Sequence, residues 1–186
     1  MAKGNIKSKK GFTIIEVVLV LAIAGLIFLM VFIALPALQS SQRNTQREND
    51  LSRFLTAVTA YAGNNNGRIP FENVSNITNF ITRYIDNTCD SNENFMQPVS
   101  EDACSADQFR DPDGNIYSFS EAKIGVTVGE DGSFPVTNLD EQHIVYFATG
   151  HLCGSLEATT RVGTGNRQVA LYMVLEGGSV TCNDNG

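Results

Sequence analysis

Residues 9–16 read Lys-Lys-Gly-Phe-Thr-Ile-Ile-Glu and open an almost unbroken apolar run that ends at Leu35. Glu16 is the only charged residue between Phe12 and Leu35. As an α-helix rising about 1.5 Å per residue, this run of 24 residues is roughly 36 Å long, enough to span the core of a bilayer. A carboxylate inside such a segment is costly unless a partner satisfies it, so Glu16 is a candidate functional residue.

The residues before the apolar run stand in an order that differs from a secretory signal. In a secretory signal the small residues of the cleavage site follow the apolar region, whereas here Gly11 precedes it. Cleavage after Gly11 would remove the basic leader and keep the apolar segment. It would also give Phe12 a free α-amine, cationic at neutral pH and one helical turn from Glu16. The lysines of this leader are Lys3, Lys7, Lys9 and Lys10.

This arrangement resembles the leader-peptidase site of type IV pilins and of their relatives, the pseudopilins of secretion and DNA-uptake machines. The resemblance implies that Gly11 precedes the cut, that Phe12 becomes the N-methylated first residue, and that Glu16 is the fifth residue of the mature chain. It also implies a prepilin peptidase, an assembly ATPase, a membrane platform and other pilins as partners. The alternative, a plain single-pass anchor, leaves the costly Glu16 unexplained.

The composition leaves room for one small globular domain beyond the apolar segment. The chain has 186 residues, of which 13 are basic and 20 acidic; without the four leader lysines, 9 basic residues face 20 acidic ones, a net charge of −11. This charge weighs against nucleic-acid binding, which depends on neutralising phosphates. Because the lysines precede the apolar segment, the positive-inside rule predicts a single-pass membrane protein with its leader in the cytoplasm and its head outside.

The sequence predicts four segments and an α+β fold like that of pilins. Residues 1–11 are the cleaved leader, 12–36 the transmembrane and assembly half of a long spine helix, 37–62 its amphipathic half, and 63–186 the globular head. Pro36 is expected to kink or locally melt the helix. In the amphipathic half, apolar residues recur at a helical spacing that requires a packing partner: Leu51, Phe54, Leu55, Val58, Tyr61 and Ala62. Arg43 and Arg47 are expected to face solvent or to contact lipid headgroups.

The head is predicted to hold a short helix and a small antiparallel sheet on which the outer half of the spine packs. Apolar residues on one face of the short helix are Ile77, Phe80, Ile81, Tyr84 and Ile85. The segments with strand-like composition are 116–119, 124–128, 143–149, 168–175 and 179–182, and the last two read as a hairpin.

Four cysteines, all beyond the apolar segment, indicate two disulfides in an oxidising compartment. Of the three possible connectivities we predict Cys89–Cys104 and Cys153–Cys182. The first pair brackets a polar stretch that has little else to keep it compact, and the second ties the last strand to the strand region before it. The alternatives are a zinc site at Cys153, for which no complete ligand set is visible, and four free thiols.

The sequence shows no catalytic constellation, and we expect neither an enzyme nor a cofactor. There are two histidines, and no Ser or Cys lies in a nucleophile-elbow context. Asp111, Asp113 and Asn115 resemble the opening of a calcium loop, but Gly114 is misplaced and Ala122 cannot ligate at the twelfth position. An acidic turn is the favoured interpretation of these residues.

We therefore expect a structural subunit of a type IV pilus or pilus-like fibre, with a minor pilin or a pseudopilin of a type II secretion or DNA-uptake machine as the alternative. Such a subunit loses its leader, packs with many copies of itself through its apolar helix, and forms an extracellular pilus or an envelope-spanning pseudopilus. A surface adhesin or uptake subunit is a further alternative, although the acidic charge weighs against DNA. A membrane-anchored enzyme requires a catalytic cluster that the sequence lacks.

Overall fold

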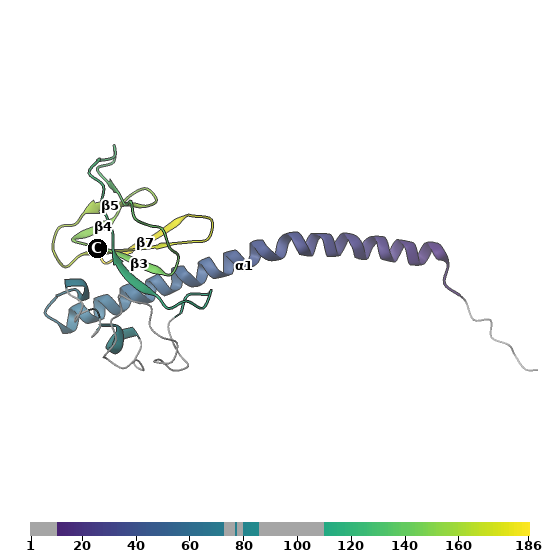
Figure 1. Ribbon diagram of the computed structural model, residues 1–186, viewed down its shortest axis with the longest axis horizontal. Coiled ribbons are helices and arrows are strands. Elements are labelled where there is room, and N and C mark those ends of the chain that lie inside the picture. Colours follow the sequence, from purple (N-terminus) through teal and green to yellow (C-terminus); the bar gives the residue numbers. More distant parts are fainter. Residues whose placement is uncertain (1–10, 73–76, 78–79, 86–109) are drawn as a thin grey trace, which may run out of the picture. The chain divides into compact units, whose positions relative to one another are not determined.

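The structure consists of a long α-helix followed in the chain by a head with two small β-sheets (Figure 1). It is a computed structural model that describes residues 11–72, 77, 80–85 and 110–186. The chain forms two compact units, Met1–Ser41 and Gln42–Gly186. The described elements are α1 (Ile14–Asn64), the 3₁₀ helix η1 (Pro70–Glu72), the π-helix η2 (Ile81–Ile85), β1 (Ser118–Glu121), β2 (Phe134–Pro135), β3 (Ile144–Thr149), β4 (His151–Cys153), β5 (Thr159–Val162), β6 (Val169–Val174) and β7 (Val180–Asp184).

The helix α1 begins and ends two residues later than the range 12–62 that the sequence predicts. It is unbroken at Pro36, so the chain is not melted there. A proline removes one backbone donor, and the flanking turns keep their own hydrogen bonds. The helix ends where Gly67 N–H donates to the carbonyl of Ala62 at 2.7 Å, with Gly67 in the left-handed region at φ 79°. A glycine in this conformation after the last turn is a common helix terminator.

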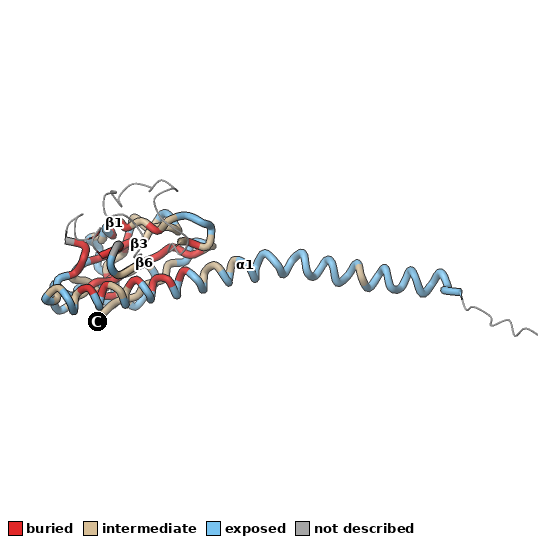
Figure 2. Tube along the Cα trace, turned by 90° about the horizontal axis from the view of Figure 1, so that it is seen from below, coloured by how far each residue is buried: buried red, intermediate tan, exposed pale blue. Residues whose placement is uncertain are grey.

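The second half of α1 is amphipathic, as the sequence predicts. Leu51, Phe54, Val58 and Tyr61 are buried, and burial follows one side of the helix in this unit (Figure 2). They pack in one core with apolar residues of the larger sheet. Phe54 contacts the rings of Tyr117 and Phe119 edge-on, with ring centroids 5.4 and 5.3 Å away. The sheet contributes Val145, Phe147, Val169, Leu171 and Met173 to this core.

The larger sheet has the strand order β1-β3-β6-β7 and is mixed. β3 pairs antiparallel with β6, and β6 with β7, which confirms the predicted C-terminal hairpin. β1 pairs with β3 in parallel, with Phe119 opposite Val145, so the sheet is mixed where the sequence predicts an antiparallel one. The predicted α+β fold, a long N-terminal helix packed on a small sheet, is confirmed. Parallel neighbours need a long crossover, and the chain between Glu121 and Ile144 provides one.

The smaller sheet, β2-β5-β4, is absent from the expectations drawn from the sequence. Its strands have two to four residues, too few for an alternating pattern to show in the sequence. The expected strand over 124–128 is reduced to a single bridge between Ile124 and Val136. On the expected short helix, Ile77, Phe80 and Ile81 are buried in the main core.

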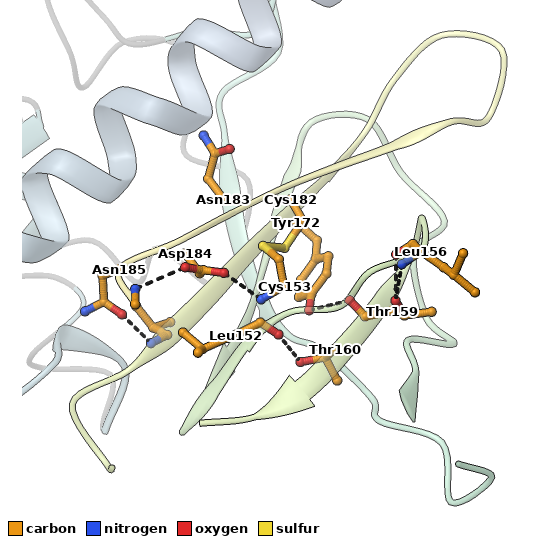
Figure 3. Close-up of a disulfide and its surroundings, with 12 residues drawn as sticks. Leu152, Cys153, Leu156, Thr159, Thr160, Tyr172, Cys182, Asn183, Asp184 and Asn185 are labelled. Atoms are coloured by element: carbon orange, nitrogen blue, oxygen red, sulfur yellow. Dashed lines mark hydrogen bonds between the residues drawn. A yellow bond between two sulfur atoms is a disulfide. The ribbon is translucent and has the colours of Figure 1, made fainter. Parts of the chain in front are cut away.

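The two sheets are joined by a disulfide between Cys153 on β4 and Cys182 on β7 (Figure 3). The Cα atoms are 5.9 Å apart, so the structure places the predicted pair at bonding distance. Beside it, the Cys153 backbone N–H donates to Asp184 Oδ2 at 2.8 Å. The Tyr172 hydroxyl donates to the Thr159 carbonyl at 3.1 Å. The other predicted pair, Cys89–Cys104, lies outside the described residues and stays a prediction.

Removing the inter-sheet disulfide is expected to weaken the head substantially. The bonded residues are 29 positions apart, for which the chain-entropy model gives about 3–4 kcal/mol of stabilisation. The double variant Cys153→Ala/Cys182→Ala should therefore unfold at a clearly lower urea concentration than the wild type. Non-reducing peptide mapping checks the pairing itself. A peptide that links Cys89 to Cys182, or an unchanged unfolding midpoint, would contradict the assignment.

Candidate processing and assembly site

The predicted cleavage point lies just before α1, where the described residues are not helical. Gly11, Phe12 and Thr13 are not helical, and Phe12 is 90% exposed. A Cβ atom built on Gly11 meets nothing within 4 Å, and its φ lies outside the left-handed region. No contact that the described part of the chain makes therefore requires a glycine at this position. A requirement for Gly11 has to come from another molecule, such as a peptidase that binds this segment.

The carboxylate of Glu16 is held by Thr13. The backbone N–H and the hydroxyl of Thr13 each donate to Oε2 of Glu16 at 2.9 Å, and the Glu16 N–H donates to Thr13 Oγ1 at 3.4 Å. This reciprocal pattern is a capping box, with Thr13 as the N-cap residue and Glu16 three positions later. In this uncut chain Phe12 precedes the cap and is outside the helix. The expectation that the free amine of a cut chain lies one helical turn from Glu16 stays a prediction.

The capping box has a sequence signature that the expectations above do not include. A Thr followed three positions later by a Glu, just before an apolar run, marks a helix start. Thr13-Ile14-Ile15-Glu16 fits this pattern. The signature predicts both the start of the helix at Ile14 and the first hydrogen-bond partner of Glu16.

The first part of α1 presents an apolar surface with no protein cover among the described residues. Its large apolar side chains are exposed from Ile14, at 85%, to Leu38, at 57%. The helix is long and apolar enough to cross a membrane, and none of its most apolar window is buried. An apolar surface of this extent requires lipid or other protein helices around it.

A comparison with known families identifies this N-terminal region. The family model described as the prokaryotic N-terminal methylation motif matches residues 6–32. The chain carries a class III prepilin leader. This signature of type IV pilins covers the second half of the leader, Gly11, Phe12, Glu16 and most of the apolar run. No curated protein and no solved structure matched the chain.

In the second half of α1, Arg47 forms the centre of an ion cluster. Its side chain is fully buried, so the expectation of a solvated or lipid-facing Arg47 is wrong. It donates to both oxygens of Asp111 at 2.6 and 2.9 Å and to Asp113 Oδ2 at 2.7 Å. Glu176 accepts a further bond from Arg47 at 3.3 Å and is also paired with Arg43. The cluster joins α1 to the turn before β1 and to the turn between β6 and β7.

The same contacts involve the residues that resemble the opening of a calcium loop. Both carboxylate oxygens of Asp111 accept hydrogen bonds from Arg47, and Asp113 accepts one from the same guanidinium. The Asp111 N–H donates to the Asn115 carbonyl at 2.9 Å, which closes a turn. Across the described ranges, no group of three or more His, Cys, Asp or Glu side chains is arranged to hold a metal. The geometry matches the acidic-turn interpretation.

Burial and pairing shift the pKa values of several groups near this cluster. Burial raises the pKa of Asp50, which accepts a hydrogen bond from the Tyr117 hydroxyl at 3.0 Å. Burial and the neighbouring Asp50 carboxylate raise the pKa of Tyr117. The hydrogen bond from Arg43 lowers the pKa of Glu176.

Replacing Asp50 with Asn is expected to make the head equally or more stable at neutral pH. The pKa of Asp50 is higher in the folded state than in the unfolded state. The folded protein therefore loses stability as the pH rises and Asp50 becomes ionised. The asparagine side chain stays neutral and still accepts the Tyr117 hydrogen bond. Relative to the wild type, the unfolding midpoint of Asp50→Asn should therefore rise as the pH is raised above about 4, the ordinary pKa of an unfolded Asp. The control Asp50→Leu, which removes the hydrogen bond between Asp50 and the Tyr117 hydroxyl, should be less stable than Asp50→Asn at every pH.

Proposed function

We propose that this protein is a structural subunit of a type IV pilus or pilus-like fibre. A prepilin peptidase removes residues 1–11, and the mature chain polymerises through the apolar part of α1. The observation that carries the proposal is the coincidence of a prepilin leader with an exposed apolar helix that starts two residues after the first residue of the mature chain. The role is structural and needs neither catalysis nor a cofactor.

The proposed assembly step exchanges lipid for protein neighbours around the first part of α1. Before assembly the subunit is a single-pass membrane protein, with its leader in the cytoplasm and its head outside. In the fibre, the Phe12 amine of one copy pairs with Glu16 of another, which satisfies two charges that are costly in an apolar environment. By resemblance, an assembly ATPase and a membrane platform drive the exchange.

A minor pilin or a pseudopilin of a secretion or DNA-uptake machine is the second candidate, because it would have the same leader and the same helix. The two candidates differ in abundance and in location. A major subunit dominates the protein sheared from the cell surface, whereas a pseudopilin stays with the envelope. Quantitative mass spectrometry of the sheared and the envelope fractions separates them.

Processing is tested most sharply by a substitution that the chain itself tolerates. A Cβ atom built on Gly11 or on Gly25 meets open space, so neither substitution is expected to disturb the subunit. Gly11→Val should be processed by a prepilin peptidase at least about tenfold more slowly than the wild type. Gly25→Val, the matched control, should be cut at the wild-type rate. Equal processing of both variants would count against cleavage after Gly11.

A further inference from the structure

The hydrogen bonds of the capping box replace backbone bonds that would carry α1 across the predicted cut. In an α-helix each backbone N–H donates to the carbonyl four residues earlier. If the helix continued toward the leader, the N–H of Glu16 would therefore donate to the carbonyl of Phe12. In the structure it donates to Oγ1 of Thr13 instead, and the Thr13 N–H donates to Oε2 of Glu16. Both donors are satisfied without a carbonyl from the residues beside the cut.

The peptide bond between Gly11 and Phe12 consequently lies outside the helix. The Thr13 carbonyl accepts the bond from the Val17 N–H at 3.4 Å and is the first backbone acceptor of α1 among the described residues. Within the same described ranges, the Gly11 carbonyl and the Phe12 N–H have no hydrogen-bond partner. A carbonyl inside a helix is occupied by an N–H donor, so a protease can attack it only after that turn has opened.

The apolar run makes the loss of this cap costly. Backbone N–H groups that lack partners in an apolar environment are unfavourable by several kcal/mol each. Without a capping side chain at position 13, the N–H groups of the first turn would gain acceptors if the helix grew by a turn toward the leader. That turn would include Gly11 and Phe12. The cap and the longer helix are therefore competing ways to satisfy the same donors.

We propose that Thr13 is a positioning residue for leader removal, because its cap starts α1 at Ile14 and keeps the bond between Gly11 and Phe12 open to the peptidase. The inference rests on the proposed function, since it requires a prepilin peptidase. In the hydrolysis, the hydroxyl of a water joins the carbonyl carbon of Gly11, the C–N bond breaks, and the nitrogen of Phe12 leaves with the proton of that water. Thr13 touches none of these atoms and acts through the conformation of the two residues before it.

Two substitutions separate capping from recognition of the side chain by its shape. Thr13→Val keeps the branched shape but cannot cap, whereas Thr13→Ser keeps the capping hydroxyl and loses the methyl group. The measurement is the cleavage rate of the full chain in lipid vesicles by a purified prepilin peptidase. Loss of an N-cap should slow cleavage of Thr13→Val about fivefold or more, and Thr13→Ser should stay within about twofold of the wild type. Equal rates for the two variants, or a slower cut of Thr13→Ser, would overturn the positioning role.

A spectroscopic readout reports the conformation of the cut segment directly. The ¹³C chemical shifts of Gly11 and Phe12 are compared in the uncut wild type and in both variants. They should be non-helical in the wild type and in Thr13→Ser, and they should move toward helical values in Thr13→Val. Slow cleavage of Thr13→Val with unchanged shifts would mean that the peptidase contacts the Thr13 side chain itself, and would overturn the inference.

The matched control is Thr56→Val, which removes a threonine hydroxyl from the same helix. That hydroxyl donates to the Ser52 carbonyl at 2.9 Å and is not part of a cap. The variant should be cut at the wild-type rate, and a rate as low as that of Thr13→Val would overturn the role of the cap. A wild-type chain that the peptidase does not cut would refute the proposed function itself. Normal cleavage of the wild type together with equally fast cleavage of Thr13→Val would refute this inference alone.

Discussion

Glu16→Ala is expected to abolish fibre assembly while the subunit still enters the membrane. Among the described residues of the apolar part of α1, Glu16 carries the only charge, and Oε1 of its carboxylate has no partner there. Removing a charge from a membrane helix favours insertion by about 2–3 kcal/mol. The amount of membrane-inserted chain should therefore be unchanged or higher. Fibre yield should fall below detection, because the neighbouring amine loses its counter-charge.

A charge-neutral variant distinguishes the two roles of Glu16. Glu16→Gln keeps the reciprocal capping bonds with Thr13, because Gln serves at this position of a capping box, but it removes the negative charge. We expect Glu16→Gln to assemble as poorly as Glu16→Ala. Shearing followed by quantitative immunoblotting measures the yield, with the membrane fraction as the loading control. Fibres of Glu16→Ala at the wild-type level would rule out pairing with the Phe12 amine.

Arg47→Met is expected to destabilise the head by about 3–5 kcal/mol, because removing one partner of a buried ion pair leaves the other charge uncompensated. The side chains of Arg47 and Asp111 are 0% and 1% exposed. Asp111 would lose both of its guanidinium bonds in this variant. The measurement is urea unfolding of the full chain in detergent, followed by a spectroscopic signal of the head.

Two controls show whether the loss comes from the buried charge. Arg53→Met removes an arginine of the same helix whose side chain is 69% exposed and lies 3.6 Å from Asp50 Oδ1. Because an exposed ion pair is worth about 0–1 kcal/mol, this variant should change the unfolding free energy by less than about 1 kcal/mol. Adding Asp111→Asn to Arg47→Met removes the uncompensated charge and should restore part of the loss. If Arg47→Met and Arg53→Met were equally mild, the cluster around Arg47 would have no stabilising role.

Structural features that depend on residues close together in the sequence can be predicted from it. The helical spacing of Leu51, Phe54 and Val58 predicts the face of α1 that is buried. The β-branched and aromatic run over 168–175 predicts β6, and the following glycines predict its hairpin with β7. The capping box of Thr13 and Glu16 can also be predicted from the sequence. An interpretation of Glu16 only as the partner of an amine overlooks this capping role.

Features that depend on distant partners are not predictable in this way. Arg47 on an isolated helix reads as a solvated cation, and its burial depends on Asp111, which lies 64 positions further along the chain. The parallel pairing of β1 with β3 depends on how the segment after Glu121 crosses over, and no local pattern specifies that. The strands of the smaller sheet are too short to show a period of two.

Intact-mass and N-terminal analysis of the protein sheared from the cell surface tests the central claim most directly. The proposed function predicts that this fraction contains the chain as a polymer, that its first residue is Phe12, and that the α-amine carries a methyl group. These three results report leader removal, modification and export together. A chain that begins at Met1 or after Ala37, or one that never leaves the membrane fraction, would contradict the proposed function.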